Sequence, residues 1–141
     1  PAEARTRELG ISAAVRFAGF MTQGQVADLL ATSDMLVLPS FAEGLPVVYM
    51  EALASRIPVV ASRVAGVQEL VEDGVTGYTV PPGDIASILD RILRLMANPN
   101  AAQAMGEAGR KAVEAGFDIS HEGAWLAQIF RQGGPEGKLR P

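Results

Sequence analysis

The sequence predicts an α/β fold in which helices cover both faces of an open parallel β-sheet. Short apolar runs that suit buried strands alternate along the chain with stretches of helical periodicity. Such alternation is typical of parallel sheets, because each connection between neighbouring strands places a helix on a face of the sheet. The chain has 141 residues, of which 48% are hydrophobic, so its length and composition suit one domain with a core.

Recognisable start and stop residues bound the elements of the first third of the chain. Gly10 ends the first helix, and Thr22 suits the N-cap of the next. The predicted elements are a helix over residues 1–9, a strand over 15–18 that ends at Gly19, a helix over 25–31 and a strand over 35–38. A central loop follows. Beyond it we expect a helix from Pro46, a strand over 57–61, a short helix over 66–71, a turn over 72–74 and a strand over 77–80.

After residue 80 the pattern predicts helices alone. Asp84 suits the N-cap of an amphipathic helix, and Asn98-Pro99 suits the start of another that ends at Gly116. A final helix is expected to carry four large apolar residues: Trp125, Leu126, Ile129 and Phe130. We therefore expect one domain over residues 1–132 and a flexible tail over residues 133–141.

Composition and charge exclude several classes of function. The net charge of −4 and the pI of about 5.0 argue against general nucleic-acid binding, which needs a basic surface. The chain has no cysteine, so it forms neither disulfides nor thiolate metal sites. No apolar run reaches the roughly 18 residues of a membrane span, and no signal peptide is recognisable. We expect a cytoplasmic protein.

The stretch from residue 39 to residue 54 carries the predicted site. Gly44 permits a sharp turn after the strand, and Pro46 suits the first position of a helix. That helix is apolar except for Glu51, and a buried carboxylate without a partner costs roughly several kcal/mol. No basic residue lies within one helical turn of Glu51. Either an Arg from another segment pairs with Glu51, or Glu51 binds a ligand.

The start of this helix predicts an anion site. The N–H groups of Leu45, Val47 and Val48 are expected at the positive end of the helix dipole, which binds phosphate. Glu43 precedes that end, and Glu51 leans back over it because helical side chains tilt toward the N-terminus. A phosphate site between two carboxylates that accept hydrogen bonds from hydroxyls suits a nucleotide sugar.

Several ordered motifs carry a family resemblance. Glu43 and Glu51 form an E-x7-E pair within Pro-Ser-Phe-Ala-Glu-Gly-Leu-Pro, which precedes Pro-Val-Val-Ala (58–61), Gly-Val-Gln-Glu-Leu-Val (66–71) and Gly-Val-Thr-Gly-Tyr (74–78). Together they resemble the donor-binding, C-terminal domain of the retaining glycosyltransferases of family four (glycosyl transferases group 1). Those enzymes have the GT-B fold, with two Rossmann-like halves. The resemblance is detailed from about residue 15 to residue 84 and looser to residue 130.

The resemblance implies a function and a set of site residues. The parent enzyme would transfer a sugar from a nucleoside diphosphate sugar to an acceptor, with retention of anomeric configuration and without a metal or other cofactor. Glu43 would take the catalytic place at the donor sugar, and Glu51 would bind the ribose. The donor-binding set also contains Gly44, Leu45, Pro46, Val47 and Val48. The loop Gly19-Phe20-Met21 follows a predicted strand at its carboxyl end, where ligands bind in such sheets, and would contact the base.

The chain also departs from the family. It lacks the first two strands, with their basic diphosphate-binding loop, and the acceptor-binding N-terminal domain, through which the parent would contact a membrane surface. Because it begins at Pro1 without Met, we expect a fragment. Without the acceptor-binding domain and the basic loop, we expect that fragment to be inactive. The family's strand order, 3-2-1-4-5-6, would leave residues 35–38 as an apolar edge that self-associates, unless residues 15–18 move to pair with it. Arg56 replaces the usual Gly, at a cost of about 1 kcal/mol if its φ is positive.

Two alternatives stay open at this point. The chain could be a catalytically silent nucleotide-binding or interaction module, or part of a phosphorylase or epimerase on the same scaffold, because a fold alone does not fix a reaction. Transfer assays on the full-length protein separate these readings.

Overall fold

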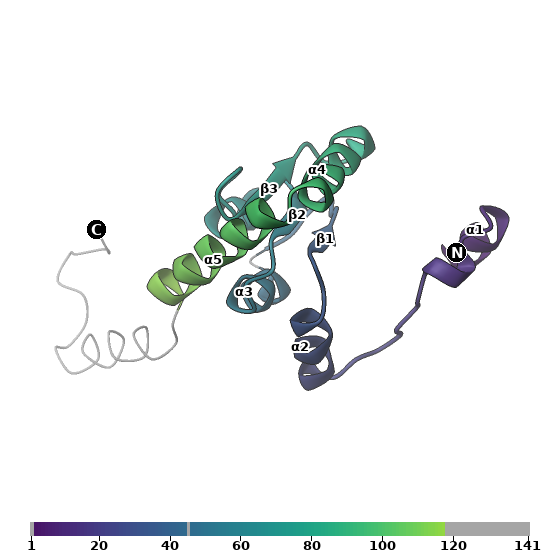
Figure 1. Cartoon of the computed structure of the whole chain (residues 1–141), viewed down its shortest axis with the longest axis horizontal. Helices are drawn as coiled ribbons and strands as arrows, with labels where there is room; N and C mark the ends of the chain where they lie inside the picture. Colours follow the sequence, from purple (N-terminus) through teal and green to yellow (C-terminus); the bar gives the residue numbers. More distant parts are fainter. Residues whose placement is uncertain (1, 45, 118–141) are drawn as a thin grey trace, which may run out of the picture.

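A three-stranded parallel sheet forms the centre of the protein. The computed structural model describes residues 2–44 and 46–117. The strands β1 (Leu36–Leu38), β2 (Val59–Ser62) and β3 (Gly77–Val80) lie side by side in the order β1-β2-β3 (Figure 1). Both pairings are parallel, with Val37 opposite Val60 and Val60 opposite Tyr78. The predicted parallel α/β fold is confirmed.

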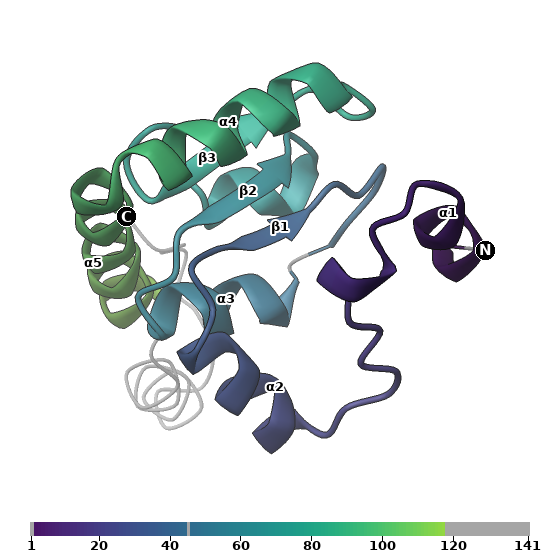
Figure 2. The ribbon, with the colours of Figure 1, turned by 45° about the vertical axis from the view of Figure 1, so that its right-hand side comes forward.

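Helices cover both faces of this sheet. Figure 2 shows α4 (Ile85–Ala97) on one face and α3 (Val47–Ala54) on the other. Side chains of a strand alternate between faces, so Val59 and Ala61 pack toward α3 while Val60 packs toward α4. All four residues of β2 are buried, which explains the continuous apolar run in the sequence.

Three of the helices begin at the N-caps that the sequence predicts. In α2 (Gln23–Ala31), Thr22 Oγ1 accepts from the N–H of Gln25 while Gln25 Oε1 accepts from the N–H of Thr22, a capping box. Asp84 caps α4 through the N–H of Ser87 at 3.0 Å. Asn98 caps α5 (Pro99–Gly116), which packs against α3 and α4.

The junction of α3, α5 and β2 depends on close backbone packing. Arg56 follows α3 with a φ of 62°. This is the left-handed conformation that favours Gly, the usual residue at this position in the family that the chain resembles. Its Nε lies 3.0 Å from Glu107 Oε1 on α5. A Cβ at Gly106 would lie 2.0 Å from the carbonyl oxygen of Arg56, and one at Gly109 would lie 2.5 Å from Leu53 Cδ2. The two glycines therefore let α5 approach α3 closely.

The predicted strand over residues 15–18 is wrong. Val15 has extended backbone angles, but no described residue pairs with this segment, and every residue from 11 to 20 is exposed. A strand needs a neighbour for its N–H and C=O groups, and here the segment runs apart from the sheet toward α1 (Ala2–Glu8), as both ribbon views show. It does not pair with β1 either, so β1 is bonded to β2 alone among the described strands.

Smaller differences concern element ends. Pro46 is the N-cap of α3 rather than its first residue. The short elements over Ser12–Ala14 (η1) and Ala65–Glu69 (η2) are 3-10 helices. The predicted helix that carries Trp125 and the predicted tail over residues 133–141 lie outside the described residues.

Candidate functional site

The candidate site lies where β1 ends and the chain turns into α3. Parallel strands place their carboxyl ends at one edge of the sheet, and ligands bind in open α/β sheets at that edge. The loop over residues 39–46 connects the last residue of β1, Leu38, to the first residue of α3, Val47. Of that loop, Leu45 lies outside the described residues.

Only one side of α3 is buried, contrary to the expectation of a helix covered all round. Tyr49, Ala52 and Leu53 pack into the core against the sheet and α5, whereas Val47 is 57% exposed and Glu51 is half-buried. The reason is that α2 covers the far side of α3 only in part. Val47, in the first turn of the helix, lies on the open side.

The first turn of α3 begins with N–H groups that have no acceptor within the helix. The N–H of Tyr49 donates to the carbonyl of Pro46 at 3.1 Å, which closes the first turn. Val47 and Val48 precede it, and helix geometry gives their N–H groups no acceptor within the helix. Gly44, in the loop before them, is exposed, with nothing within 4 Å of the place where a Cβ would stand.

Glu43 is held at the start of this turn by its own loop. Ser40 Oγ donates a hydrogen bond to Glu43 Oε1, and the Glu43 side chain is half-buried. Tyr49, in the first turn of α3, is fully buried, and its hydroxyl donates to the carbonyl of Leu38 at 3.0 Å. Burial first, and the negative charge of Glu43 second, raise the pKa of Tyr49 to about 12.

Glu51 lies between α3 and the start of α2. Gln23 Nε2 donates to Glu51 Oε1 at 3.3 Å. Within residues 2–44 and 46–117, no Lys or Arg forms an ion pair with Glu51, so the alternative of a buried Glu–Arg pair is not what the described contacts show. A half-buried carboxylate with one amide donor keeps acceptor capacity for a ligand.

The predicted base-contacting loop, residues 19–21, directly precedes the cap of α2. Gly19 has a φ of 67°, Phe20 is 96% exposed, and Met21 is half-buried just before the cap of α2. Gln23, two residues after Met21, contacts Glu51. The described contacts thus bring the start of α2 to the carboxylate of α3, and the base-contacting role of residues 19–21 stays a prediction.

Sequence reasoning missed two residues of this region, Gln23 and Tyr49. The contact of Gln23 with Glu51 joins residues 28 positions apart, and the contact of Tyr49 with Leu38 spans the loop between β1 and α3. Local sequence patterns do not predict such contacts. The one available signal was Tyr49 itself, a hydroxyl within an otherwise apolar helix segment, since a buried Tyr usually finds a hydrogen-bond partner.

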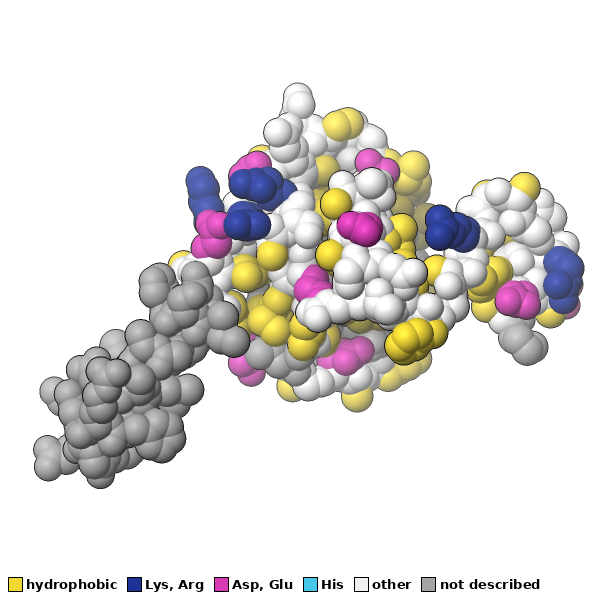
Figure 3. All heavy atoms as spheres, turned by 90° about the horizontal axis from the view of Figure 1, so that it is seen from below, with side chains coloured by type: hydrophobic (Ala, Val, Ile, Leu, Met, Phe, Trp, Pro, Cys, Tyr) yellow, Lys and Arg dark blue, Asp and Glu magenta, His cyan; other side chains and the backbone are white. Residues whose placement is uncertain are grey.

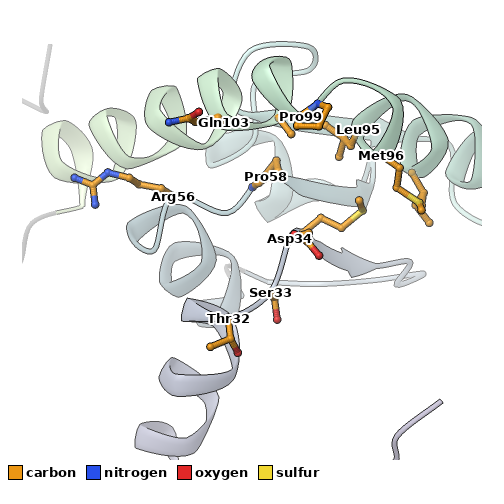
Figure 4. Close-up of a pocket in the computed structure, with 12 residues that line it drawn as sticks. Thr32, Ser33, Asp34, Arg56, Pro58, Leu95, Met96, Pro99 and Gln103 are labelled. Carbon is orange, nitrogen blue, oxygen red and sulfur yellow. The ribbon is translucent and has the colours of Figure 1, made fainter. Parts of the chain in front are cut away.

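A hollow of the surface lies elsewhere. It measures about 920 Å³, and its lining includes Met35 and Pro58, which directly precede β1 and β2, together with the facing ends of α4 and α5 (Figure 4). It therefore opens at the amino ends of the strands, away from Glu43 and Glu51. We do not assign the site there, because the carboxyl edge is where parallel sheets bind ligands.

The remaining surface gives few further chemical signals. On the face shown in Figure 3, acidic side chains are spread between apolar ones, and the basic side chains stand in separate groups. Among the described residues, no three His, Asp or Glu side chains cluster so as to hold a metal ion. The same part of the chain contains no helix with the length and apolarity needed to cross a bilayer.

Solved structures of similar shape define the class of fold. The chain superposes on sucrose-phosphate synthase from Thermosynechococcus elongatus with a TM-score of 0.87 and 32% identity, over 93% of this chain and 33% of that one. It superposes on Anabaena HepE in complex with UDP with a TM-score of 0.86 and 24% identity, over 93% of this chain and 36% of that one. With its open parallel sheet, the chain is a Rossmann-like domain of the GT-B type.

The sequence comparison identifies the family. The family model of glycosyl transferases group 1 matches residues 1–112, and the chain belongs to that family. It is 34% identical to alpha-D-kanosaminyltransferase of Streptomyces kanamyceticus, over 87% of this chain and 32% of the relative. It is 31% identical to glycogen synthase of Mycobacterium tuberculosis, over 89% of this chain and 30% of that enzyme. The chain thus spans about a third of the length of these curated relatives.

Proposed function

We propose that this chain is the donor-binding part of a glycosyltransferase that moves a sugar from a nucleoside diphosphate sugar to an acceptor with retention of configuration. The single observation that carries the proposal is that Glu43, in the loop before the first turn of α3, and Glu51, one turn further along that helix, are both half-buried carboxylates. Membership of the family supports transfer as the reaction. HepE, a protein of the same fold, has been solved with UDP and with UDP-glucose.

Each part of the site has a role in this proposal. The N–H groups of Val47 and Val48, at the positive end of the α3 dipole, meet a phosphate of the donor. Glu51 accepts hydrogen bonds from the ribose hydroxyls, and Gln23 holds its carboxylate in place. Glu43, which Ser40 orients, accepts from the hydroxyls of the transferred sugar. Phe20 supplies an exposed aromatic face for the base.

The chemistry that these residues support is positioning and charge stabilisation. In this proposal, two carboxylates and a helix N-terminus bind the donor, orient the sugar and stabilise charge that develops on the leaving phosphate. Retention follows if the acceptor attacks the face from which the phosphate leaves. The 141 residues match about a third of the length of the curated relatives, and we propose that the acceptor-binding groups lie outside them, so that these residues alone catalyse no transfer.

A donor screen tests this function. The full-length protein is incubated with a panel of nucleoside diphosphate sugars and candidate acceptors, and both product formation and anomeric configuration are read by NMR. The proposal expects one donor class to give a product with retained configuration. Inversion refutes the retaining mechanism, and nucleotide binding without any transfer favours the silent-module alternative. Phosphorolysis or epimerisation of the donor favours the other alternative.

A further inference from the structure

We propose that Tyr49 is a positioning residue for the loop that carries Glu43, with its hydroxyl tying the first turn of α3 to the end of β1. The inference deepens the proposed function and rests on it, because it assigns this loop to the sugar side of the donor site. Tyr49 does not touch the donor in this proposal. It acts through Glu43.

The hydrogen bond of Tyr49 joins the two ends of the loop. The loop leaves the sheet after Leu38 and returns to regular structure at Val47. The Tyr49 hydroxyl donates to the Leu38 carbonyl at 3.0 Å, across the base of the loop. A loop whose ends are fixed relative to each other has fewer conformations, so the residues on it are held more narrowly.

A second hydrogen bond carries this restraint to the carboxylate. Ser40 follows Leu38 by two residues and donates from Oγ to Glu43 Oε1. Fixing Leu38 restricts the position of Ser40, two residues later. The hydrogen bond from Ser40 then restricts the position of the Glu43 carboxylate. Tyr49 therefore reaches Glu43 through two short steps, from Tyr49 to Leu38 and from Ser40 to Glu43.

The state of the Tyr49 hydroxyl suits this role. The side chain is fully buried, and the raised pKa given above means that the hydroxyl stays protonated at neutral pH. The hydroxyl therefore donates to the Leu38 carbonyl at neutral pH.

A purely apolar role for Tyr49 would not need the hydroxyl. The ring packs in the core with Leu53 and Val59, and a phenylalanine would fill almost the same volume there. Replacing Tyr49 by Phe would nevertheless leave the Leu38 carbonyl without this donor. A substitution that removes only the Tyr49 hydroxyl therefore tests the inference.

The test compares Tyr49→Phe with Tyr78→Phe in the full-length enzyme. Tyr78 is the matched control because it lies on the α4 side of the sheet, where Arg91 stacks on its ring at 4.9 Å, away from the loop. We expect Tyr49→Phe to lower kcat by about two- to thirteenfold, the effect of one hydrogen bond, while the Kd for the free nucleoside diphosphate changes by less than about twofold. Tyr78→Phe should leave both values as in the wild type.

A double-mutant cycle with Glu43→Gln separates positioning from general loosening. If Tyr49 acts through Glu43, adding Tyr49→Phe to the Glu43→Gln variant lowers kcat no further. Additive losses, or an unchanged kcat in Tyr49→Phe, overturn the inference. If Tyr49→Phe does not fold, Tyr49→Met, which also lacks the hydroxyl, takes its place in the same cycle, with the same two outcomes. A wild-type enzyme without transfer activity refutes the proposed function and this inference together, whereas an active wild type with additive losses refutes the inference alone.

Discussion

The close approach of α5 to the end of α3 predicts a large effect of one added methyl group. In Gly106→Ala, the new Cβ would lie 2.0 Å from the carbonyl oxygen and 2.7 Å from the carbonyl carbon of Arg56, whereas real Cβ contacts stay beyond 3.0 Å. The neighbour is backbone and cannot rotate away. Since Arg56 already has a φ of 62° and leads directly into Ile57 and β2, we expect α5 to move instead, by about 1 Å.

The expected movement of α5 determines how far Gly106→Ala lowers the free energy of unfolding. Overpacking a close-packed site costs about 1–3 kcal/mol, and the upper part of the range applies because movement of α5 also loosens Gly109 from Leu53. The control is Gly24→Ala in α2, an exposed helical glycine with nothing within 4 Å of the place where a Cβ would stand, which should gain about 0.5–1 kcal/mol.

Equilibrium urea denaturation, followed by far-UV circular dichroism, measures both variants. We expect a lower midpoint for Gly106→Ala and a slightly higher one for Gly24→Ala, with unchanged slopes. A Gly106→Ala variant as stable as the wild type would show that α5 does not pack against the Arg56 backbone as described.

Three further predictions concern the loop, the junction and the sheet edge. Glu43→Gln should depress transfer but spare affinity for the free nucleoside diphosphate, and an equal affinity loss in Glu43→Gln and Glu51→Ala would assign Glu43 to the nucleotide instead. Arg56→Gly should be more stable to urea than Arg56→Ala by about 1 kcal/mol, because both lose the exposed Glu107 pair while only Gly relieves the left-handed conformation, and equal stability would contradict this. The 141-residue chain should dimerise or aggregate in light scattering through the outer edge of β1, and a stable monomer would show that this edge is less costly than we expect.

The features that sequence predicts well are those with local causes. Thr22, Asp84 and Asn98 bond to residues three positions away, so each N-cap was visible in the sequence. Gly10, with a φ of 68°, likewise follows the end of α1. The turn into α3 was found to within one residue, since Pro46 suits both the N-cap and the first helical position.

The features that sequence misses depend on distant partners. Residues 15–18 have strand-like composition, yet no described strand pairs with them. Composition alone does not show whether a segment has a neighbouring strand to pair with. Gln23 and Tyr49 enter the candidate site through contacts with Glu51 and Leu38, in other segments. The need for glycine at positions 106 and 109 arises from Arg56 and Leu53, about fifty residues earlier, and no helical pattern shows it.

The role of Glu51 is the central claim about the site, and isothermal titration calorimetry tests it most directly. The full-length enzyme and its Glu51→Ala variant are titrated with the nucleoside diphosphate of the preferred donor, with Glu72→Ala as a control at an exposed carboxylate in the turn before β3. Loss of hydrogen bonds to a charged group predicts a weakening of about 1.5–3 kcal/mol, or roughly 10- to 150-fold in Kd, for Glu51→Ala alone. Unchanged affinity in a normally folded Glu51→Ala variant would contradict the assignment of Glu51 to the ribose.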